Sequence, residues 1–248
     1  MIVAEIGLNH NGNVNYANRY INFLKRADVD AITLQVREKN FYLSRKRKHL
    51  KLPFSFYEKD FFRLKSKNNK AIGLSIVDLE TFNYFKSIKF DFFKILSFGA
   101  YNKKLIDYIL KSTNAKIYIS CGLLKKKKMS EYLKKYRNNK RVKFIYTKLT
   151  YNVSNINLIN LFDFAKENED KFAYGHHYLN DLPIVMATTI RNIDIFVYVK
   201  GQRLRKHPDE KHAFTFTQLN LLLKKIKEVR DILGEKKIFT KTDIPGLR

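Results

Sequence analysis

The first residues of the chain combine a strand-like apolar run with groups that can do acid–base chemistry. Glu5 lies in the middle of an apolar run over residues 2–7, and a Gly/Asn-rich turn with Asn9 and His10 follows. A carboxylate inside a buried strand is unfavourable unless it pairs with a cation or takes part in chemistry. Glu5 is therefore a candidate acid–base or ion-pairing group, with an imidazole close behind it.

The rest of the chain shows which elements position these groups. Short β-branched or aromatic runs alternate with amphipathic stretches of about ten residues. The pattern predicts strands over residues 2–7, 31–36, 71–76, 92–96, 116–120, 142–146, 172–175 and 193–199. It predicts helices over residues 16–25, 57–67, 79–88, 103–111, 130–135, 158–167, 182–190 and 217–233.

Eight βα units favour a closed parallel (β/α)8 barrel, or TIM barrel, over an open sheet. A chain of 248 residues has a typical length for one such α/β domain. We therefore expect a single domain over residues 1–248, with a short C-terminal tail at 235–248. The insert at 38–56 is long for a βα loop, and we expect it to cover the mouth.

Residues at the carboxyl ends of barrel strands converge on one pocket. In strand order they are Glu5, Asn9 and His10; Gln35 and Arg37; Ser75 and Asp78; Lys94 and Ser97; Ser120 and Cys121; Lys148 and Tyr151; His176 and His177; Val197, Val199 and Lys200; and, in the following loop, His207, Asp209, Lys211 and His212. This polar, cationic set suits a phosphorylated or carboxylated ligand. Lys94, Ser97 and Ser120 form a candidate phosphate site, the alternative being a structural lysine beside two turn serines.

His176 and His177 are the best candidates for a metal ligand, because imidazole is a common donor to transition metals. Adjacent strand residues face opposite sides, so only one of the pair points inward. A single inward histidine needs at least one more protein ligand to make a metal site.

The net charge of +26 permits a nucleic-acid or anionic-surface partner, or simply reflects a lysine-rich composition spread along the chain. We prefer the interpretation that the charge reflects the lysine-rich composition, because no nucleic-acid motif accompanies the basic runs. No apolar run approaches the roughly 20 residues that span a bilayer. The single cysteine, Cys121, fits a reducing compartment, so we expect a cytoplasmic protein that binds no membrane.

The ordered motifs resemble those of the sialic acid (N-acetylneuraminate) synthase family. The most specific match is residues 4–12, Ala-Glu-Ile-Gly-Leu-Asn-His-Asn-Gly. Further matches follow in order at residues 30–32 with Gln35, 78–80, 93–95 with Ser97, 119–122, Tyr151, His177 and 208–211.

The resemblance implies condensation of phosphoenolpyruvate with an N-acylated amino-sugar aldehyde, giving a sialic-acid-like nonulosonic acid and phosphate. Lys94, Ser97 and Ser120 would hold the phosphate and carboxylate, and Gln35 and Tyr151 would contact the sugar. Glu5 would handle a proton or position water, and His177 would ligate a Mn²⁺- or Mg²⁺-type ion that polarises the aldehyde. The matched motifs add four substrate-binding residues, namely Asn9, His10, Asp209 and Lys211.

The chain also departs from the family pattern. Thr33 stands in place of a phosphate-binding lysine, and Val197 and Val199 are aligned with an eighth-strand Glu and a second metal His. His176, His207 or His212 could substitute for that histidine. Because the sequence stops at Arg248, we expect it to lack the family's usual C-terminal antifreeze-like domain, and the oligomer considered is a homodimer.

Two alternatives to a synthase follow. The first is a non-catalytic barrel that binds an anionic ligand or a sugar-pathway partner. The second is a nucleic-acid or anionic-surface binder, which only the basic runs support.

Overall fold

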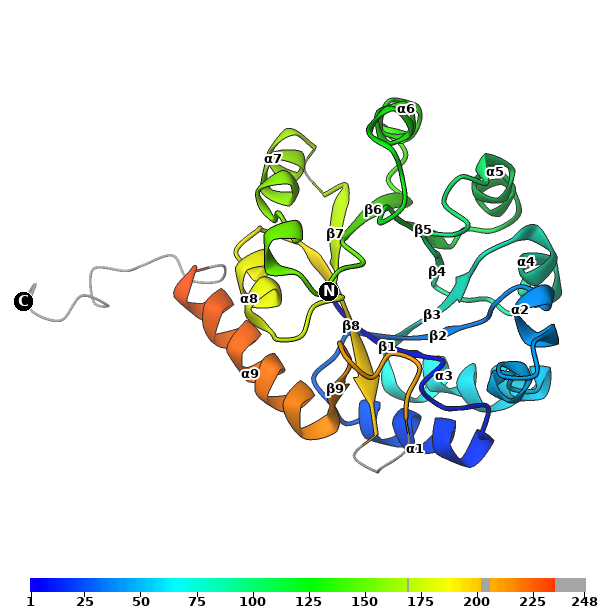
Figure 1. Ribbon diagram of the computed structural model, residues 1–248. Coiled ribbons are helices and arrows are strands. Elements are labelled where there is room, and N and C mark those ends of the chain that lie inside the picture. Colours follow the sequence, from blue (N-terminus) through cyan, green and yellow to red (C-terminus); the bar gives the residue numbers. More distant parts are fainter. Residues whose placement is uncertain (169, 202–205, 235–248) are drawn as a thin grey trace, which may run out of the picture.

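The computed structural model describes residues 1–168, 170–201 and 206–234. The predicted tail at 235–248 lies outside these residues. Parallel strands form a closed barrel, ringed by helices (Figure 1). The strands are β1 (Ile2–Gly7), β2 (Ala31–Gln35), β3 (Ala71–Ile76), β4 (Phe92–Ile95), β5 (Lys116–Ser120), β6 (Val142–Thr147), β7 (Phe172–Gly175) and β8 (Asp194–Lys200). β1 pairs with both β2 and β8, which closes the barrel and confirms the predicted (β/α)8 fold.

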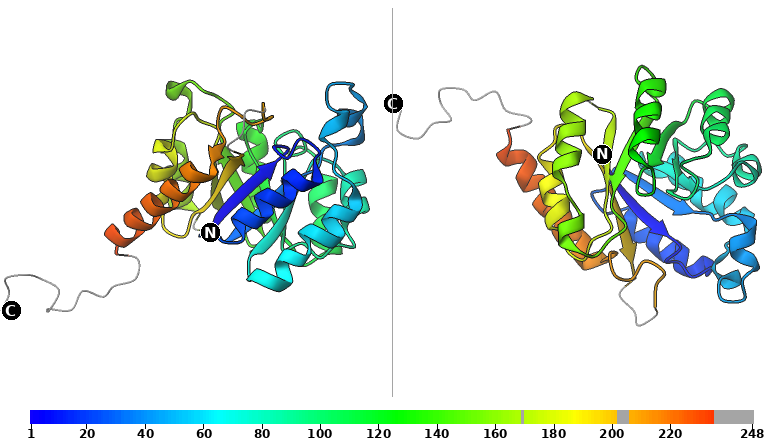
Figure 2. Two further views of the ribbon diagram at one scale, coloured as in Figure 1. Left: turned by 90° about the horizontal axis from the view of Figure 1, so that it is seen from below. Right: turned by 45° about the horizontal axis from the view of Figure 1, so that its top comes forward.

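Helices follow the strands in alternation. They are α1 (Val14–Leu24), α2 (Lys39–Leu43), α3 (Arg63–Asn68), α4 (Leu79–Phe85), α5 (Lys103–Ser112), α6 (Lys126–Tyr136), α7 (Ile159–Glu167), α8 (Leu182–Thr188) and α9 (Phe216–Ile232). α9 begins with a capping box between Thr215 and Gln218 and packs beside α8 on the outside of the barrel (Figure 2). No helix in the described part of the chain is long and apolar enough to cross a membrane.

Two helical segments differ from the sequence prediction. α6 begins at Lys126 rather than at residue 130, because its lysine-rich first turn was read as surface loop. The predicted helix at 57–67 is a wide π-type turn, Phe56–Phe61, followed by the short α3. The insert at 38–56 holds α2 and a 3-10 turn, Lys48–Leu50, that packs on the β1–α1 turn. A Cβ on Gly12 would lie 1.7 Å from the His49 carbonyl oxygen.

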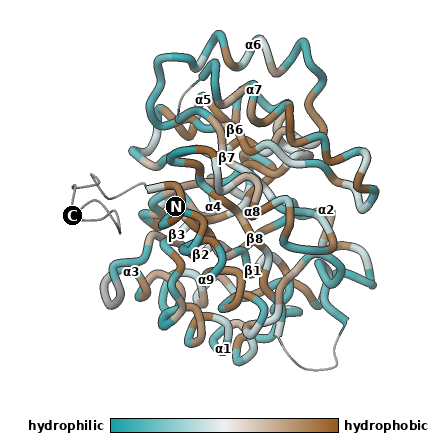
Figure 3. Tube along the Cα trace, turned by 90° about the vertical axis from the view of Figure 1, so that its left-hand side faces the viewer, coloured by the Kyte–Doolittle hydropathy of each residue, from teal (hydrophilic) through white to brown (hydrophobic). Residues whose placement is uncertain are grey.

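Strand alternation sorts the apolar residues into two layers. One layer fills the space between barrel and helices, so that the strands read as hydrophobic and the outer helix turns as hydrophilic (Figure 3). The other fills the barrel interior and contains Val3, Ala31, Phe92, Tyr118, Ile145, Ala173 and Phe196. Inside the barrel the ring of Phe196 packs edge-on against Tyr118 at 4.9 Å. We call this interior apolar layer the floor, because the polar residues described below lie directly above it.

A short ninth strand brings the chain back to the mouth. β9 (Phe214–Thr215) pairs in parallel with Val199 and Lys200 at the end of β8. The loop between β8 and β9 must therefore return to the carboxyl end of the barrel, and residues 206–213 lie there. This loop supplies several groups of the site described next.

Candidate active site

A layer of buried polar side chains lies directly above the apolar floor. Its members occupy the next inward positions of their strands, two residues beyond a floor residue or, on β3, beyond Gly73. They are Glu5, Thr33, Ser75, Lys94, Ser120, Thr147 and, on β8, Tyr198. Polar groups gathered in a barrel interior at the carboxyl ends of the strands are typical of an active site.

A buried ion pair crosses the centre of this layer. Lys94 Nζ on β4 donates to both carboxylate oxygens of Glu5 on β1, at 2.6 and 2.5 Å, and both side chains are at most 3 % exposed. The ammonium also lies 5.2 Å from the ring centroid of Phe196 and 5.4 Å from that of Tyr198. Burial raises the pKa of Glu5, and the charge and hydrogen bonds of Lys94 oppose that rise. Glu5 therefore has the cation that its position on the strand requires.

Hydroxyl groups on the strands next to β4 belong to the same layer as the lysine. Ser97 Oγ lies 2.9 Å from Ser120 Oγ, and Thr33 Oγ1 lies 3.3 Å from Ser75 Oγ. Thr147 Oγ1 is buried without a hydrogen-bond partner among the described residues. A Cβ on Gly122 would lie 3.0 Å from the Thr147 methyl and 3.1 Å from Ser97 Oγ, so this backbone passes close to both hydroxyl-bearing side chains.

The turn after β1 holds the β8–β9 loop in place. Asn9 donates to the Val199 carbonyl oxygen at 2.8 Å and accepts from the Asp209 backbone N–H at 3.0 Å. His10 Nδ1 accepts from the Gly12 backbone N–H at 2.9 Å. Both side chains are fully buried. These hydrogen bonds hold the loops around the site, while His10 Nε2 is buried without a hydrogen-bond partner among the described residues, and substrate binding by Asn9 and His10 stays a prediction.

Asp209 reaches the edge of the polar layer through this loop. A Cβ on Gly7 would lie 2.9 Å from Asp209 Oδ2 and 2.7 Å from the Tyr198 ring. Gly7 has φ +57° and follows a β-bulge in β1, so the bend lets the loop approach. Burial, and then the charge of Glu5, raise the pKa of Asp209 to about 7.

The adjacent histidines on β7 face opposite sides, as expected. His176 is fully buried in the outer layer, with its ring 5.4 Å from Phe214. His177 faces the site, and its ring lies 4.4 Å from that of His212 and 5.4 Å from that of Tyr198. His212 lies in the β8–β9 loop and was predicted only as one of three possible substitutes for a metal ligand.

The alignment of Val197 and Val199 with site positions is wrong. Both side chains are fully buried in the outer layer against the helices. The inward positions of β8 at these two levels of the barrel are Phe196 in the floor and Tyr198 in the polar layer. The alternation of inward and outward side chains along β8 is the sequence signal that could have found Tyr198.

The rim carries the other predicted ligands. Tyr151 is 42 % exposed, and its hydroxyl lies 3.1 Å from His212 Nδ1. The exposed Lys211 ammonium lies 5.2 Å from the Tyr151 ring, and Gln35 is half-buried at the end of β2. His207 is engaged with Glu210 and with the Tyr16 hydroxyl. Of the three possible substitutes, only His212 therefore joins His177.

The donor set does not fit a metal ion. No group of three or more His, Cys, Asp or Glu side chains in the described ranges could hold one. His212 and His177 provide two imidazoles, and the nearest carboxylate oxygen, Asp209 Oδ1, is 3.8 Å from His212 Nε2. Mg²⁺ and Mn²⁺ prefer several oxygen ligands, which these residues do not supply.

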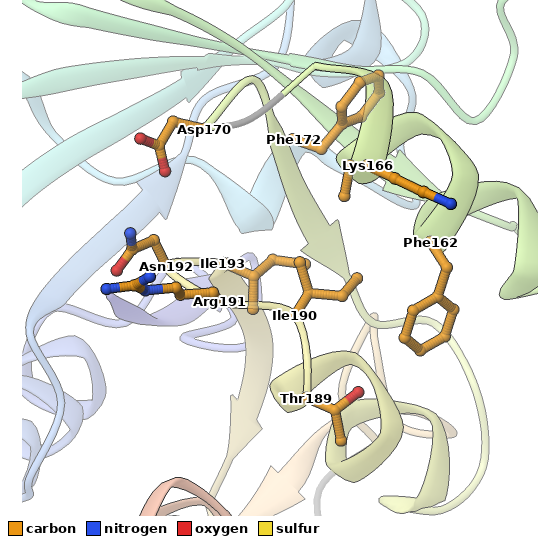
Figure 4. A pocket seen from close by; sticks show the side chains of 10 residues that line it. Phe162, Lys166, Asp170, Phe172, Thr189, Ile190, Arg191, Asn192 and Ile193 are labelled. Carbon is orange, nitrogen blue, oxygen red and sulfur yellow. The ribbon is translucent and has the colours of Figure 1, made fainter. Parts of the chain in front are cut away.

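A hollow lies at the end of the barrel opposite to the polar layer. This pocket of about 340 Å³ lies beneath the amino ends of β7 and β8, between Phe162 and Lys166 of α7 and the turn with Arg191 and Asn192 (Figure 4). None of the predicted site residues line it. The polar layer, and not this pocket, is the candidate active site.

Known proteins share this fold. N-acetylneuraminic acid (sialic acid) synthetase from Leptospira borgpetersenii matches with a TM-score of 0.83 and 22 % identity, over 97 % of this chain and 87 % of that chain. The spore coat polysaccharide biosynthesis protein SpsE from Bacillus subtilis matches with a TM-score of 0.78 and 16 % identity, over 97 % and 71 %. A truncated 3-deoxy-D-arabino-heptulosonate 7-phosphate synthase from Thermotoga maritima matches with a TM-score of 0.67 and 15 % identity, over 94 % and 87 %. At these identities the similarity shows the fold alone.

A search of curated proteins gave no match. The sequence itself matches the NeuB family over residues 23–238, which is most of its length. That match covers all strands after β1 and the residues from Gln35 to His212. The chain belongs to the NeuB family.

Proposed function

We propose that this protein condenses phosphoenolpyruvate with an N-acylated amino-sugar aldehyde, giving a nonulosonic acid and inorganic phosphate. Family membership supports phosphoenolpyruvate-dependent sugar condensation in general. The observation that carries the proposal is the buried Lys94–Glu5 pair among hydroxyls at the carboxyl end of the barrel. An ammonium and serine hydroxyls bind phosphate and carboxylate oxygens well.

Lys94, Ser97 and Ser120 bind the anionic groups of phosphoenolpyruvate in this proposal. Lys94 has three N–H donors and gives two of them to Glu5, so one is left for the ligand. The Ser97–Ser120 hydrogen bond joins two hydroxyls, each of which can turn toward a phosphate oxygen. The net charge of +26 draws anions to the molecule but does not position them.

The acceptor sugar binds nearer to the rim. Gln35, Tyr151, Asp209 and Lys211 lie there, and their amide, hydroxyl and charged groups suit a polyhydroxylated aldehyde. C3 of phosphoenolpyruvate attacks the aldehyde carbon, which leaves positive charge at C2. Water then adds its hydroxyl to C2 and gives its other proton to the new alkoxide. The bond between C2 and the phosphate oxygen breaks as C2 becomes a ketone, and the phosphate leaves with the proton of that hydroxyl.

Glu5 stabilises the positive charge at C2 and positions the attacking water. Its carboxylate is held rigidly by Lys94, so it needs little reorganisation during the reaction. The divalent ion used in the family has no fitting donor set here, and no step of this proposal passes through one.

One observation favours a non-catalytic barrel as a second candidate. The inward positions of β8 carry Phe196 and Tyr198, which ligate no metal of the family's kind, while the anion-binding groups are retained. Such a protein would bind phosphoenolpyruvate without turning it over.

A phosphate-release assay separates the two candidates. Wild type should release phosphate from phosphoenolpyruvate only when a 2-acetamido-2-deoxyhexose is also present. Lys94→Met should lose this activity, whereas Lys134→Met, an exposed lysine on α6, should keep it. Phosphoenolpyruvate binding without release for any acylamino aldose would support the non-catalytic barrel.

A further inference from the structure

Two imidazoles meet at the mouth of the barrel from different elements. His177 follows β7 and His212 lies in the β8–β9 loop, and their ring centroids are 4.4 Å apart at an interplanar angle of 38°. The Tyr198 ring stands edge-on to His212 at 5.0 Å. β9 and the hydrogen bond between Asn9 and the Asp209 backbone hold the β8–β9 loop in place. The fold itself therefore brings His212 next to His177.

The His212 ring has one paired nitrogen and one that is buried and unpaired. Tyr151 engages His212 Nδ1 at 3.1 Å, whereas His212 Nε2 is buried and has no hydrogen-bond partner among the described residues. Leaving such a group buried and unpaired is unfavourable by about 1–3 kcal/mol. An unpaired buried nitrogen therefore often has a functional role, such as binding a ligand. When the Tyr151 hydroxyl donates to Nδ1, Nε2 carries the proton and is a free donor.

The surroundings keep both imidazoles neutral. Burial, and then the charge of Lys94, lower the pKa of His212 to about 4. Burial and the charge of His212 lower the pKa of His177 well below its usual value. Asp209 faces the pair, with Oδ1 3.8 Å from His212 Nε2. The charge of Lys94 acts on both rings, and that of Lys200 acts on His212 as well. Neutral imidazoles can donate a hydrogen bond to a carbonyl oxygen without delivering a full proton.

We propose that His212 is a catalytic residue of this chain: with His177, it donates a hydrogen bond to the carbonyl oxygen of the aldehyde acceptor and does the work of a divalent ion. The inference rests on the proposed function. As the new C–C bond forms, the carbonyl π electrons move to oxygen, and the hydrogen bond strengthens with the growing charge. The imidazole stays neutral, because the alkoxide takes the proton that water releases when its hydroxyl adds to C2.

The first test measures metal binding without reference to turnover. Mn²⁺ alone is titrated into metal-free protein and free Mn²⁺ is followed by electron paramagnetic resonance. The proposal predicts no stoichiometric site in wild type and no change in His212→Ala or His177→Ala. A one-to-one Mn²⁺ site that either substitution abolishes would show that the pair ligates a metal and would overturn the proposal.

The second test measures catalysis in chelator. Phosphate release from phosphoenolpyruvate with 2-acetamido-2-deoxyhexoses is assayed in EDTA and in Mn²⁺. Wild type should be about equally active in both. His212→Ala should lower kcat about 100-fold with KM for phosphoenolpyruvate nearly unchanged, because removing one donor to a developing oxyanion has about this effect. His212→Gln should recover part of the loss, and His49→Ala, an exposed histidine, should have no effect.

The outcomes separate the two claims. Activity that requires Mn²⁺, or a His212→Ala variant with normal kcat, would overturn the role of His212 and leave the condensation standing. No phosphate release from wild type in either EDTA or Mn²⁺, with any acylamino aldose, would overturn the proposed function and this role with it.

Discussion

Lys94 on β4 donates to both carboxylate oxygens of Glu5 on β1, at 2.6 and 2.5 Å, across the interior of the barrel. The pair lies above an aromatic floor and below the mouth, so an anionic ligand that reaches Lys94 meets a lysine already oriented. The same pairing makes the site sensitive to the loss of either partner. Several expected effects of substitution depend on this relationship.

Lys94→Met should abolish anion binding and destabilise the fold. The variant removes the ammonium and leaves the Glu5 carboxyl buried without a cation, a change that typically lowers the free energy of unfolding by about 3–5 kcal/mol. Chemical denaturation and titration of phosphoenolpyruvate by calorimetry measure the two effects. Normal affinity for phosphoenolpyruvate in this variant would rule out Lys94 as its ligand.

A double variant separates folding from binding. In Glu5→Gln/Lys94→Met neither charge remains, so much of the stability should return while binding stays lost. A double variant as unstable as Lys94→Met would mean that the ion pair is not the source of the stability change. Recovered binding in the double variant would place the anion elsewhere.

Ser97→Ala and Ser120→Ala should each weaken phosphoenolpyruvate binding by about tenfold or more, the usual effect of losing a hydrogen bond to a charged group. Each loses one hydroxyl of the 2.9 Å pair and leaves Lys94 untouched. Ser130→Ala, an exposed serine on α6 that bonds the Lys126 carbonyl, is the matched control. Equal affinities in all three variants would exclude the serine pair from the anion site.

Asp209→Asn should change how stability depends on pH. The pKa of Asp209 is raised to about 7 in the folded protein, so between about pH 4 and 7 the folded state keeps a proton that the unfolded chain has released. The free energy of unfolding should therefore fall as pH rises through this window. The group can contribute at most about 4 kcal/mol to that fall. Denaturant unfolding at several pH values should give a flatter profile for Asp209→Asn, and identical slopes would contradict the raised pKa.

Gly7→Ala should disturb the fold and the site together. Gly7 has φ +57°, and an added Cβ would lie 2.7 Å from the Tyr198 ring and 2.9 Å from Asp209 Oδ2. The backbone strain alone is unfavourable by about 1–3 kcal/mol, and the clash adds to it. Thermal unfolding should show a lower Tm than wild type. An unchanged Tm would mean that the backbone at the β1 bulge adjusts to the added Cβ at no cost in stability, which would contradict this prediction.

The barrel could be predicted from the sequence because each βα unit carries its own periodicity. The predicted bounds of all eight strands lie within a few residues of those in the structure. This succeeds because a short apolar run is a local signal that does not depend on the rest of the fold. The start of α6 was missed because lysines at 126–128 carry no apolar period. The turn at Phe56–Phe61 was missed because a π-type turn and a helix share nearly the same pattern.

The site was harder to predict, because it depends on which face of a strand is inward. Glu5 could be singled out by chemistry, but its partner Lys94 lies 89 residues away and only the barrel brings them together. Val197 and Val199 were given site positions that belong to the other face of β8. His212 joins His177 only because β9 returns the loop to the mouth, and a two-residue strand gives almost no sequence signal.

The most direct test of the account is mass spectrometry of the product formed from phosphoenolpyruvate and a 2-acetamido-2-deoxyhexose. The account predicts a 2-keto-3-deoxy acid that contains all carbons of both substrates, formed with one phosphate per product, by wild type and not by Lys94→Met. Phosphoenolpyruvate recovered unchanged with every acylamino aldose, in the presence or absence of Mn²⁺, would contradict the account.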